Sequence, residues 1–164
     1  MKRIRTMVFS ALLGALLLVV QVVLAPLPNV ELVSLLVLLY TLEFPHQTPG
    51  TIGVFVVLEG LVYGFGLWWV MYLYLWPLLA LVVWLLRKNT SVLLWAVVLG
   101  GFGLCFGMLC AIPYALAGGI AAGIAYWISG IPFDLAHCVG NFLLTLALYR
   151  PMRSALQQIR KNLW

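Results

Sequence analysis

Long apolar runs, separated by short groups of Pro, Gly, Asn and charged residues, make up almost the whole chain. These groups mark the ends of six predicted helices, of which the second is short. The helices are expected at roughly 6–25, 30–44, 51–66, 68–86, 92–113 and 132–150. Since a membrane-spanning helix needs about 20 apolar residues, the pattern predicts an all-α membrane protein. We expect a compact six-transmembrane-helix bundle, formed by a single domain over residues 1–164.

One further apolar stretch falls between the fifth and sixth predicted helices. It reads "YALAGGIAAGIAYWISG" and is too apolar for a loop in water. Backbone polar groups need partners at membrane depth, so a loop there must be buried in protein or lie at the interface. We therefore expect residues 114–131 to form a partly buried outer loop, with Pro132 at the start of the last helix.

The composition agrees with a membrane location. Of the residues, 65% are hydrophobic and 8% are charged, whereas soluble proteins have about 25% charged residues. The first apolar run has the basic start of a signal peptide, but Pro26 would directly follow the cleavage site, where processing is disfavoured. We therefore expect this run to be retained as the first helix.

The nine Lys and Arg residues lie in small groups at 2–5, 87–88, 150–153 and 160–161. Every group falls on the same side of the six-helix pattern. The positive-inside rule therefore predicts that the N-terminus and the C-terminus are both cytoplasmic. Because these groups form no continuous basic surface, we do not expect nucleic-acid binding.

Rare polar and aromatic side chains gather near the predicted outer ends of the helices. At about 100° per residue, Asp134, His137 and Asn141 share one face of the last helix. Polar groups at membrane depth usually face a bundle interior or a wet cavity, so this gathering predicts an outward-facing binding pocket. The candidate substrate-binding residues are Asn29, Glu31, Glu59, Tyr63, Trp68, Tyr72, Trp76, Tyr114, Asp134, His137 and Asn141.

The same residues also fit roles without a ligand. The polar face of the last helix could join helices through hydrogen bonds or belong to a proton relay, although "FLLTLALY" offers the relay no continuation. Trp68 could be an interfacial belt residue, and Tyr72 and Trp76 could pack the core. Glu31 could be an ordinary acid at a helix N-terminus. Glu59 lies within an apolar run and must face a ligand or an internal partner.

The sequence excludes several chemistries. It has no GxxxxGK[ST] phosphate-binding loop, no GxSxG or HExxH motif and no paired-cysteine metal box. Its three cysteines, Cys105, Cys110 and Cys138, lie in apolar segments and are expected to be buried and inert. We therefore expect a protein that is not an enzyme and that holds no metal and no cofactor.

Four segments resemble the substrate-binding S components of energy-coupling factor (ECF) transporters, which are small six-helix membrane proteins of bacteria. They are "ALLGA" in the first helix, which is similar to the family's AxxxA pattern, "PNVELVSLLVLLYT", "EGLVYGFGLWWVMYLYLW" and "GIPFDLAHCVGNF". Together they extend the resemblance over essentially the whole chain.

The resemblance implies both a function and a location. A member of this family is a multi-pass subunit of the bacterial cytoplasmic membrane that binds a vitamin or a similar heteroaromatic micronutrient with high affinity. Ala11, Gly14 and Ala15 would dock onto a transmembrane coupling subunit, and two separate ATPases would supply the energy. Because no Lys or Arg lies in the predicted outer half, we expect a neutral or cationic cargo rather than a polyanion.

Two other functions fit part of the pattern. A structural membrane protein of the cell-shape machinery, of the MreD type, is similar in size and number of spans and would need no pocket. A membrane-embedded enzyme could use Asp134 and His137 as an acid/base pair, because residues three apart lie on one helix face. Binding of a small molecule would separate the substrate-binding subunit from the structural protein.

Overall fold

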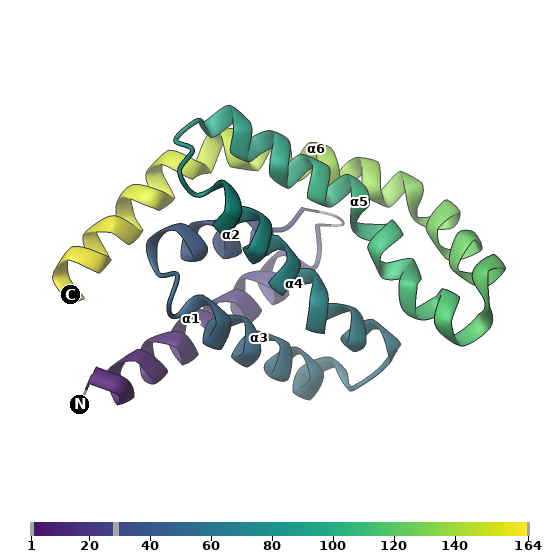
Figure 1. The fold of residues 1–164 in the computed structure, drawn as a ribbon, viewed down its shortest axis with the longest axis horizontal. Helices are drawn as coiled ribbons and strands as arrows, with labels where there is room; N and C mark the ends of the chain where they lie inside the picture. The colour runs from purple at the N-terminus through teal and green to yellow at the C-terminus, as the bar shows by residue number, and fades with distance from the viewer. Residues whose placement is uncertain (1, 28–29, 164) are drawn as a thin grey trace.

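Six α-helices account for most of the chain (Figure 1). The computed structural model describes residues 2–27 and 30–163. The helices are α1 (Lys2–Leu24), α2 (Val33–Glu43), α3 (Thr48–Tyr63), α4 (Leu67–Leu86), α5 (Val92–Gly118) and α6 (Ile120–Leu163). Within the described residues there is no strand, so the predicted all-α class is confirmed.

The short helix α2 lies at the centre of the fold. Ten of its eleven residues are buried, and α1, α3, α4 and α6 all contact it. A helix that is hydrophobic on all sides belongs in a protein interior, and "VSLLVLLYTLE" has this composition. Leu17 of α1, Phe55 of α3, Leu79 of α4 and Trp95 of α5 complete the core around it.

The prediction of an outer loop between the fifth and sixth helices is wrong. Helix α5 continues to Gly118, α6 begins at Ile120, and only Gly119, with φ of 85°, separates them. Residues 114–131 extend the two helices for two reasons. A helix pairs its own backbone groups, as apolar surroundings require, and the alanines of this segment have high helix propensity. Pro132 consequently lies inside α6 and does not begin it.

Glycines allow α5 and α6 to pack closely as an antiparallel pair (Figure 1). A Cβ atom on Gly103 would lie 2.9 Å from the backbone of His137. A Cβ atom on Gly123 would lie 2.6 Å from Cβ of Ala115. Larger residues would force the helices apart, so these glycines set the register that brings the two helices to the candidate site.

Four helices, α1, α4, α5 and α6, are long and apolar enough to span a membrane. At 1.5 Å per residue, α2 and α3 reach about 17 Å and 24 Å, less than the roughly 30 Å of a bilayer core. The chain thus has membrane-type helices, while six spans and their orientation remain predictions. Helix α1 begins and α6 ends on the same side of the molecule (Figure 1).

The cysteines differ in their exposure. Cys110 is buried and Cys138 is partly buried, but Cys105 is exposed on α5. The expectation that all three would be buried is therefore wrong for Cys105. An apolar segment does not reveal which of its residues face outward when the whole surface of the helix is apolar.

Charged side chains join the last part of α6 to the end of α2. Oε1 of Glu43 accepts hydrogen bonds from Nε of Arg153 (2.7 Å) and from Nε2 of Gln157 (3.1 Å). Its Oε2 lies 2.9 Å from Nη1 of Arg160, and Arg153 also donates to the hydroxyl of Tyr149 (2.6 Å). These five residues form what we call the Glu43 cluster, in which one buried carboxylate meets two cations.

Candidate substrate-binding site

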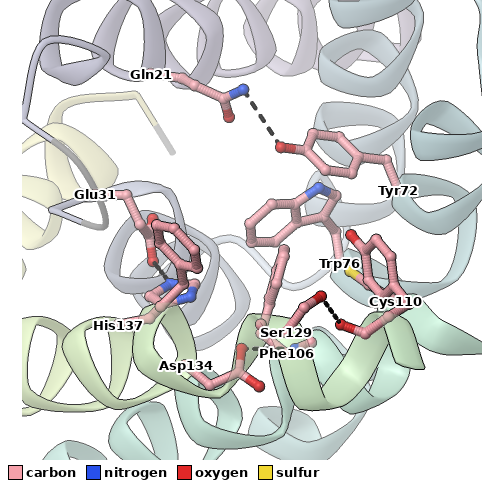
Figure 2. Close-up of a pocket in the computed structure, with 13 residues that line it drawn as sticks. Gln21, Glu31, Tyr72, Trp76, Phe106, Cys110, Ser129, Asp134 and His137 are labelled. Carbon is pink, nitrogen blue, oxygen red and sulfur yellow. Dashed lines mark hydrogen bonds and ion pairs between the residues drawn. The ribbon is translucent and has the colours of Figure 1, made fainter. Parts of the chain in front are cut away.

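A cavity of about 450 Å³ lies between α1, α4, α5 and α6, next to the connection from α1 to α2. Figure 2 shows nine labelled side chains arranged around this main cavity. Its walls are formed by Gln21, Glu31, Tyr72, Trp76, Phe106, Gly107, Cys110, Tyr126, Ser129, Gly130, Phe133, Asp134 and His137. Five elements distant in sequence therefore contribute to one space.

A second cavity of about 470 Å³, the side cavity, adjoins the main one. The two share Gln21, Glu31 and Tyr72 as walls. The side cavity is further lined by Leu24, Ala25, Leu27, Val30, Glu59, Tyr63 and Trp68. The α1–α2 connection thus borders both spaces.

Most of the predicted site residues line one of the two cavities. Those at the main cavity are Glu31, Tyr72, Trp76, Asp134 and His137. Those at the side cavity are Glu31, Glu59, Tyr63, Trp68 and Tyr72. The helices therefore bring together side chains that are separated by up to 106 positions, as in the contact between Glu31 and His137.

Three predicted residues are not placed at a cavity. The ring of Tyr114 stacks on that of Tyr126, with centroids 4.1 Å apart, and Tyr114 lines neither cavity. Nδ2 of Asn141 donates to the carbonyl of Leu99 at 3.5 Å, so Asn141 joins α6 to α5. Asn29 lies outside the described residues.

Asp134 reaches across from α6 to the backbone of α5. Its Oδ1 accepts a hydrogen bond from the N–H of Gly107 at 2.8 Å. A Cβ atom on residue 107 would lie 2.5 Å from Oδ2 of Asp134, so glycine leaves the room that the carboxylate occupies. Asp134 is 5% exposed, and its Oδ2 has no hydrogen-bond partner among the described residues.

Glu31 holds the α1–α2 connection against α6. Its Oε1 lies 3.1 Å from Nε2 of His137, and its Oε2 accepts a hydrogen bond from the N–H of Ser34 at 2.8 Å. Burial raises the pKa of Glu31, but these contacts outweigh it, and the pKa lies below its ordinary value. Asp134 and His137 therefore bond to different partners, Gly107 and Glu31, rather than to each other.

Gln21 is a site residue that the sequence interpretation missed. Its Nε2 donates to Oε2 of Glu59 (2.9 Å) and to the hydroxyl of Tyr72 (3.4 Å), and it lines both cavities. A signal was present, because Gln21 is the sole polar residue in "LLLVVQVVL". Oε1 of Glu59 has no partner within the part of the chain that the structure describes.

Aromatic rings cover much of the main cavity. Tyr72 and Trp76 contribute from α4, with centroids 5.4 Å apart, and Phe106 contributes from α5. The ring of Phe106 lies 5.0 Å from that of His137, edge to face. Tyr126 belongs to the segment that was expected to be a loop, so its place at the site depends on the correction to α6.

The small residues of α1 do not share one environment. Ala11 is exposed and Ala15 is partly buried. Gly14 is buried against α3, where a Cβ atom would lie 2.8 Å from the carbonyl oxygen of Thr51. Gly14 therefore serves the packing of α1 on α3, whereas Ala11 is accessible from outside the chain.

The arrangement is suited to binding a small, flat molecule through ring contacts and a few polar groups. Across residues 2–27 and 30–163, no group of three or more His, Cys, Asp or Glu residues is placed to hold a metal ion. No family model, curated protein or solved structure matches the chain.

Proposed function

We propose that the chain is the high-affinity substrate-binding membrane subunit of an ECF-type importer in the bacterial cytoplasmic membrane. It captures a vitamin or a related small heteroaromatic micronutrient from outside. The chain then delivers this compound through a coupling subunit, and two separate ATPases supply the energy. In this proposal the chain crosses the membrane six times, both termini are cytoplasmic, and the main cavity lies near the outer surface.

The main cavity is the observation that carries this proposal. Its volume of about 450 Å³ falls within the range of small-molecule sites, about 300–1,000 Å³. Protein interiors are close-packed, so a bundle with only a structural role would be expected to fill such a space with side chains. Here the space is kept, and rings and polar groups from four helices face it.

The surface of α1 is consistent with a partner subunit. Ala11 is exposed, and its neighbours Leu12 and Leu16 are large, exposed apolar residues. In this proposal Ala11 and Ala15 contact the coupling subunit, while Gly14 lets α1 approach α3 from the other side. The absence of a GxxxxGK[ST] motif fits a role in which other chains hydrolyse ATP.

The test is to purify the protein in mild detergent, denature it and identify the released small molecules by mass spectrometry. The wild-type protein should release one heteroaromatic compound in an amount close to that of the protein. Gly130→Phe should abolish the release, because Gly130 lines the main cavity and a Cβ there would meet no atom within 4 Å. The new ring therefore has room to occupy the binding space.

Gly101→Phe is the matched control. Gly101 is also a helical glycine whose Cβ would meet no atom within 4 Å, but it is exposed and lines neither cavity. It should release as much compound as the wild type. Release of no small molecule from either protein, with co-purification of cell-wall synthesis proteins, would favour the structural alternative.

A further inference from the structure

The acidic residues at the two cavities have almost no basic partner. Glu31 and Asp134 line the main cavity and Glu59 lines the side cavity. Among the described residues, neither cavity is lined by Lys or Arg, and His137 is already in contact with Glu31. A molecule bound there meets acid side chains without a counter-charge, which favours a cation or a donor of hydrogen bonds.

Two buried polar groups at the main cavity lack partners. Oδ2 of Asp134 and Nε1 of Trp76 have no hydrogen-bond partner within the described ranges, although Asp134 is 5% exposed and Trp76 is 2% exposed. Buried polar atoms are satisfied in most proteins, so each such atom needs an explanation. Both side chains line the same cavity. Neither atom is exposed to it in this structure, so the two side chains must turn toward a bound molecule before it can supply an N–H to one and an acceptor to the other.

The other acids are less suited to this role. Both oxygens of Glu31 already have partners, His137 and the N–H of Ser34. Glu59 accepts a hydrogen bond from Gln21 and lines the side cavity rather than the main one. Asp134 is thus the carboxylate that can select a ligand in the main cavity.

The rings around Asp134 indicate the shape of that ligand. Tyr72, Trp76 and Phe106 lie close to one another on the walls of the main cavity (Figure 2). Aromatic faces stack on flat rings and attract positive charge, so they favour a planar molecule with cationic character.

We propose that the main cavity binds a planar nitrogen heterocycle, neutral or positively charged, which donates an N–H to Asp134 and accepts a hydrogen bond from the Trp76 indole. This inference rests on the proposed function, in which the cavity holds the cargo. Asp134 is then the residue that determines specificity. It admits amino-substituted rings and rejects ring carboxylates, because a second carboxylate beside it would have no counter-charge.

The experiment compares two probes of similar shape by equilibrium dialysis in detergent: 5-aminoquinoline, which offers an N–H donor and a free ring nitrogen, and quinoline-5-carboxylate. The wild-type protein should bind the amine about tenfold or more tightly than the carboxylate, the effect of one hydrogen bond to a charged group. Asp134→Asn should remove most of this preference, because the amide keeps an oxygen for the N–H of Gly107 but loses the negative charge. The binding that remains in Gly130→Phe occurs outside the main cavity, and it is subtracted from the binding measured for every other variant.

Glu31→Gln is the matched comparison, since it makes the same change at another wall of the cavity. It should retain most of the preference for the amine. Equal or tighter binding of the carboxylate to the wild type would overturn the proposal. So would an unchanged preference in Asp134→Asn, or a loss in Glu31→Gln as large as that in Asp134→Asn.

Failure of the Asp134 assignment can be distinguished from failure of the proposed substrate-binding role. If mass spectrometry identifies a co-purified anion without an N–H donor, the assignment to Asp134 is wrong while the substrate-binding role stands. If the protein releases no compound and binds neither probe, both proposals fail.

Discussion

The chain buries one carboxylate in the Glu43 cluster and others at the two cavities, and their surroundings differ. In the Glu43 cluster, each oxygen of the acid lies within 3.1 Å of a nitrogen, and two of the three nitrogens belong to arginines. At the main cavity, Asp134 bonds to one backbone N–H and leaves its other oxygen without a partner among the described residues. Oε2 of Glu43 also lacks a hydrogen bond, but it lies against the cation of Arg160. Oδ2 of Asp134 has neither a hydrogen bond nor a cation beside it among the described residues.

This difference separates a structural site from a binding site. Ion pairs that are complete within the fold leave nothing for a ligand to contact, and Glu43 lines neither the main cavity nor the side cavity. An unpaired oxygen beside a space of about 450 Å³ leaves both room and a contact. Changes in the Glu43 cluster should therefore alter stability, and changes around Asp134 should alter binding.

The largest effect on stability is expected from Arg153→Ala. It leaves the carboxylate of Glu43, 1% exposed, with only the more exposed Arg160 as a cation. Leaving a buried charge without any partner costs about 3 kcal/mol or more. Since Arg160 and Gln157 remain beside Glu43, the unfolding free energy in detergent should fall by about 2–3 kcal/mol. Ligand affinity of the folded protein should not change. Arg150→Ala, on an exposed neighbour, is the control and should leave stability nearly unchanged.

Gly107→Ala is the corresponding change at the main cavity. The added methyl would lie 2.5 Å from Oδ2 and 2.8 Å from Oδ1 of Asp134, so the carboxylate must move and lose its hydrogen bond to residue 107. We expect affinity for the released compound to fall about tenfold or more, with a loss of about 1–3 kcal/mol in unfolding free energy.

Gly101→Ala is the control for this change, because a Cβ there meets no atom within 4 Å. It should bind as the wild type does, and its greater helix propensity should leave stability unchanged or slightly higher. Normal binding by Gly107→Ala would show that the position of Asp134 is unimportant and would remove the contrast with Glu43.

The sequence predicted the class of the fold better than the ends of its helices. Apolar runs located all six helices, because each run must bury its surface or face lipid. The glycines of residues 114–131 and Pro132 were interpreted as boundaries. Within this segment, however, only Gly119 interrupts the helical structure, and Pro132 is accommodated within α6. Helices in apolar surroundings can continue through a proline, because neighbouring groups and small backbone adjustments pair the carbonyl that the proline leaves free.

Only part of the site could be predicted, because only some of its residues stand out in the sequence. Glu31, Asp134 and His137 are ionisable residues in apolar surroundings, so each of them required an explanation from sequence alone. Phe106 and Tyr126 gave no such signal, because an aromatic residue in an apolar helix is equally suited to core, lipid or cavity. Their places follow from the register of α5 and α6, which close contacts at the glycines determine.

Tyr74→Phe should have the smallest effect, and it tests whether a satisfied polar group near the site matters for binding. The Tyr74 hydroxyl donates to the carbonyl of Leu109 at 2.7 Å. That carbonyl lacks its helical donor, since residue 113 is proline and has no N–H. Losing this hydrogen bond should lower the unfolding free energy by about 1 kcal/mol, and ligand affinity should stay the same because Tyr74 lines neither cavity. In a Pro113→Ala background, where the N–H of residue 113 is restored, the same substitution should cost less. A loss of binding in Tyr74→Phe would mean that satisfied and unsatisfied groups contribute alike, and the contrast between Glu43 and Asp134 would no longer identify the site.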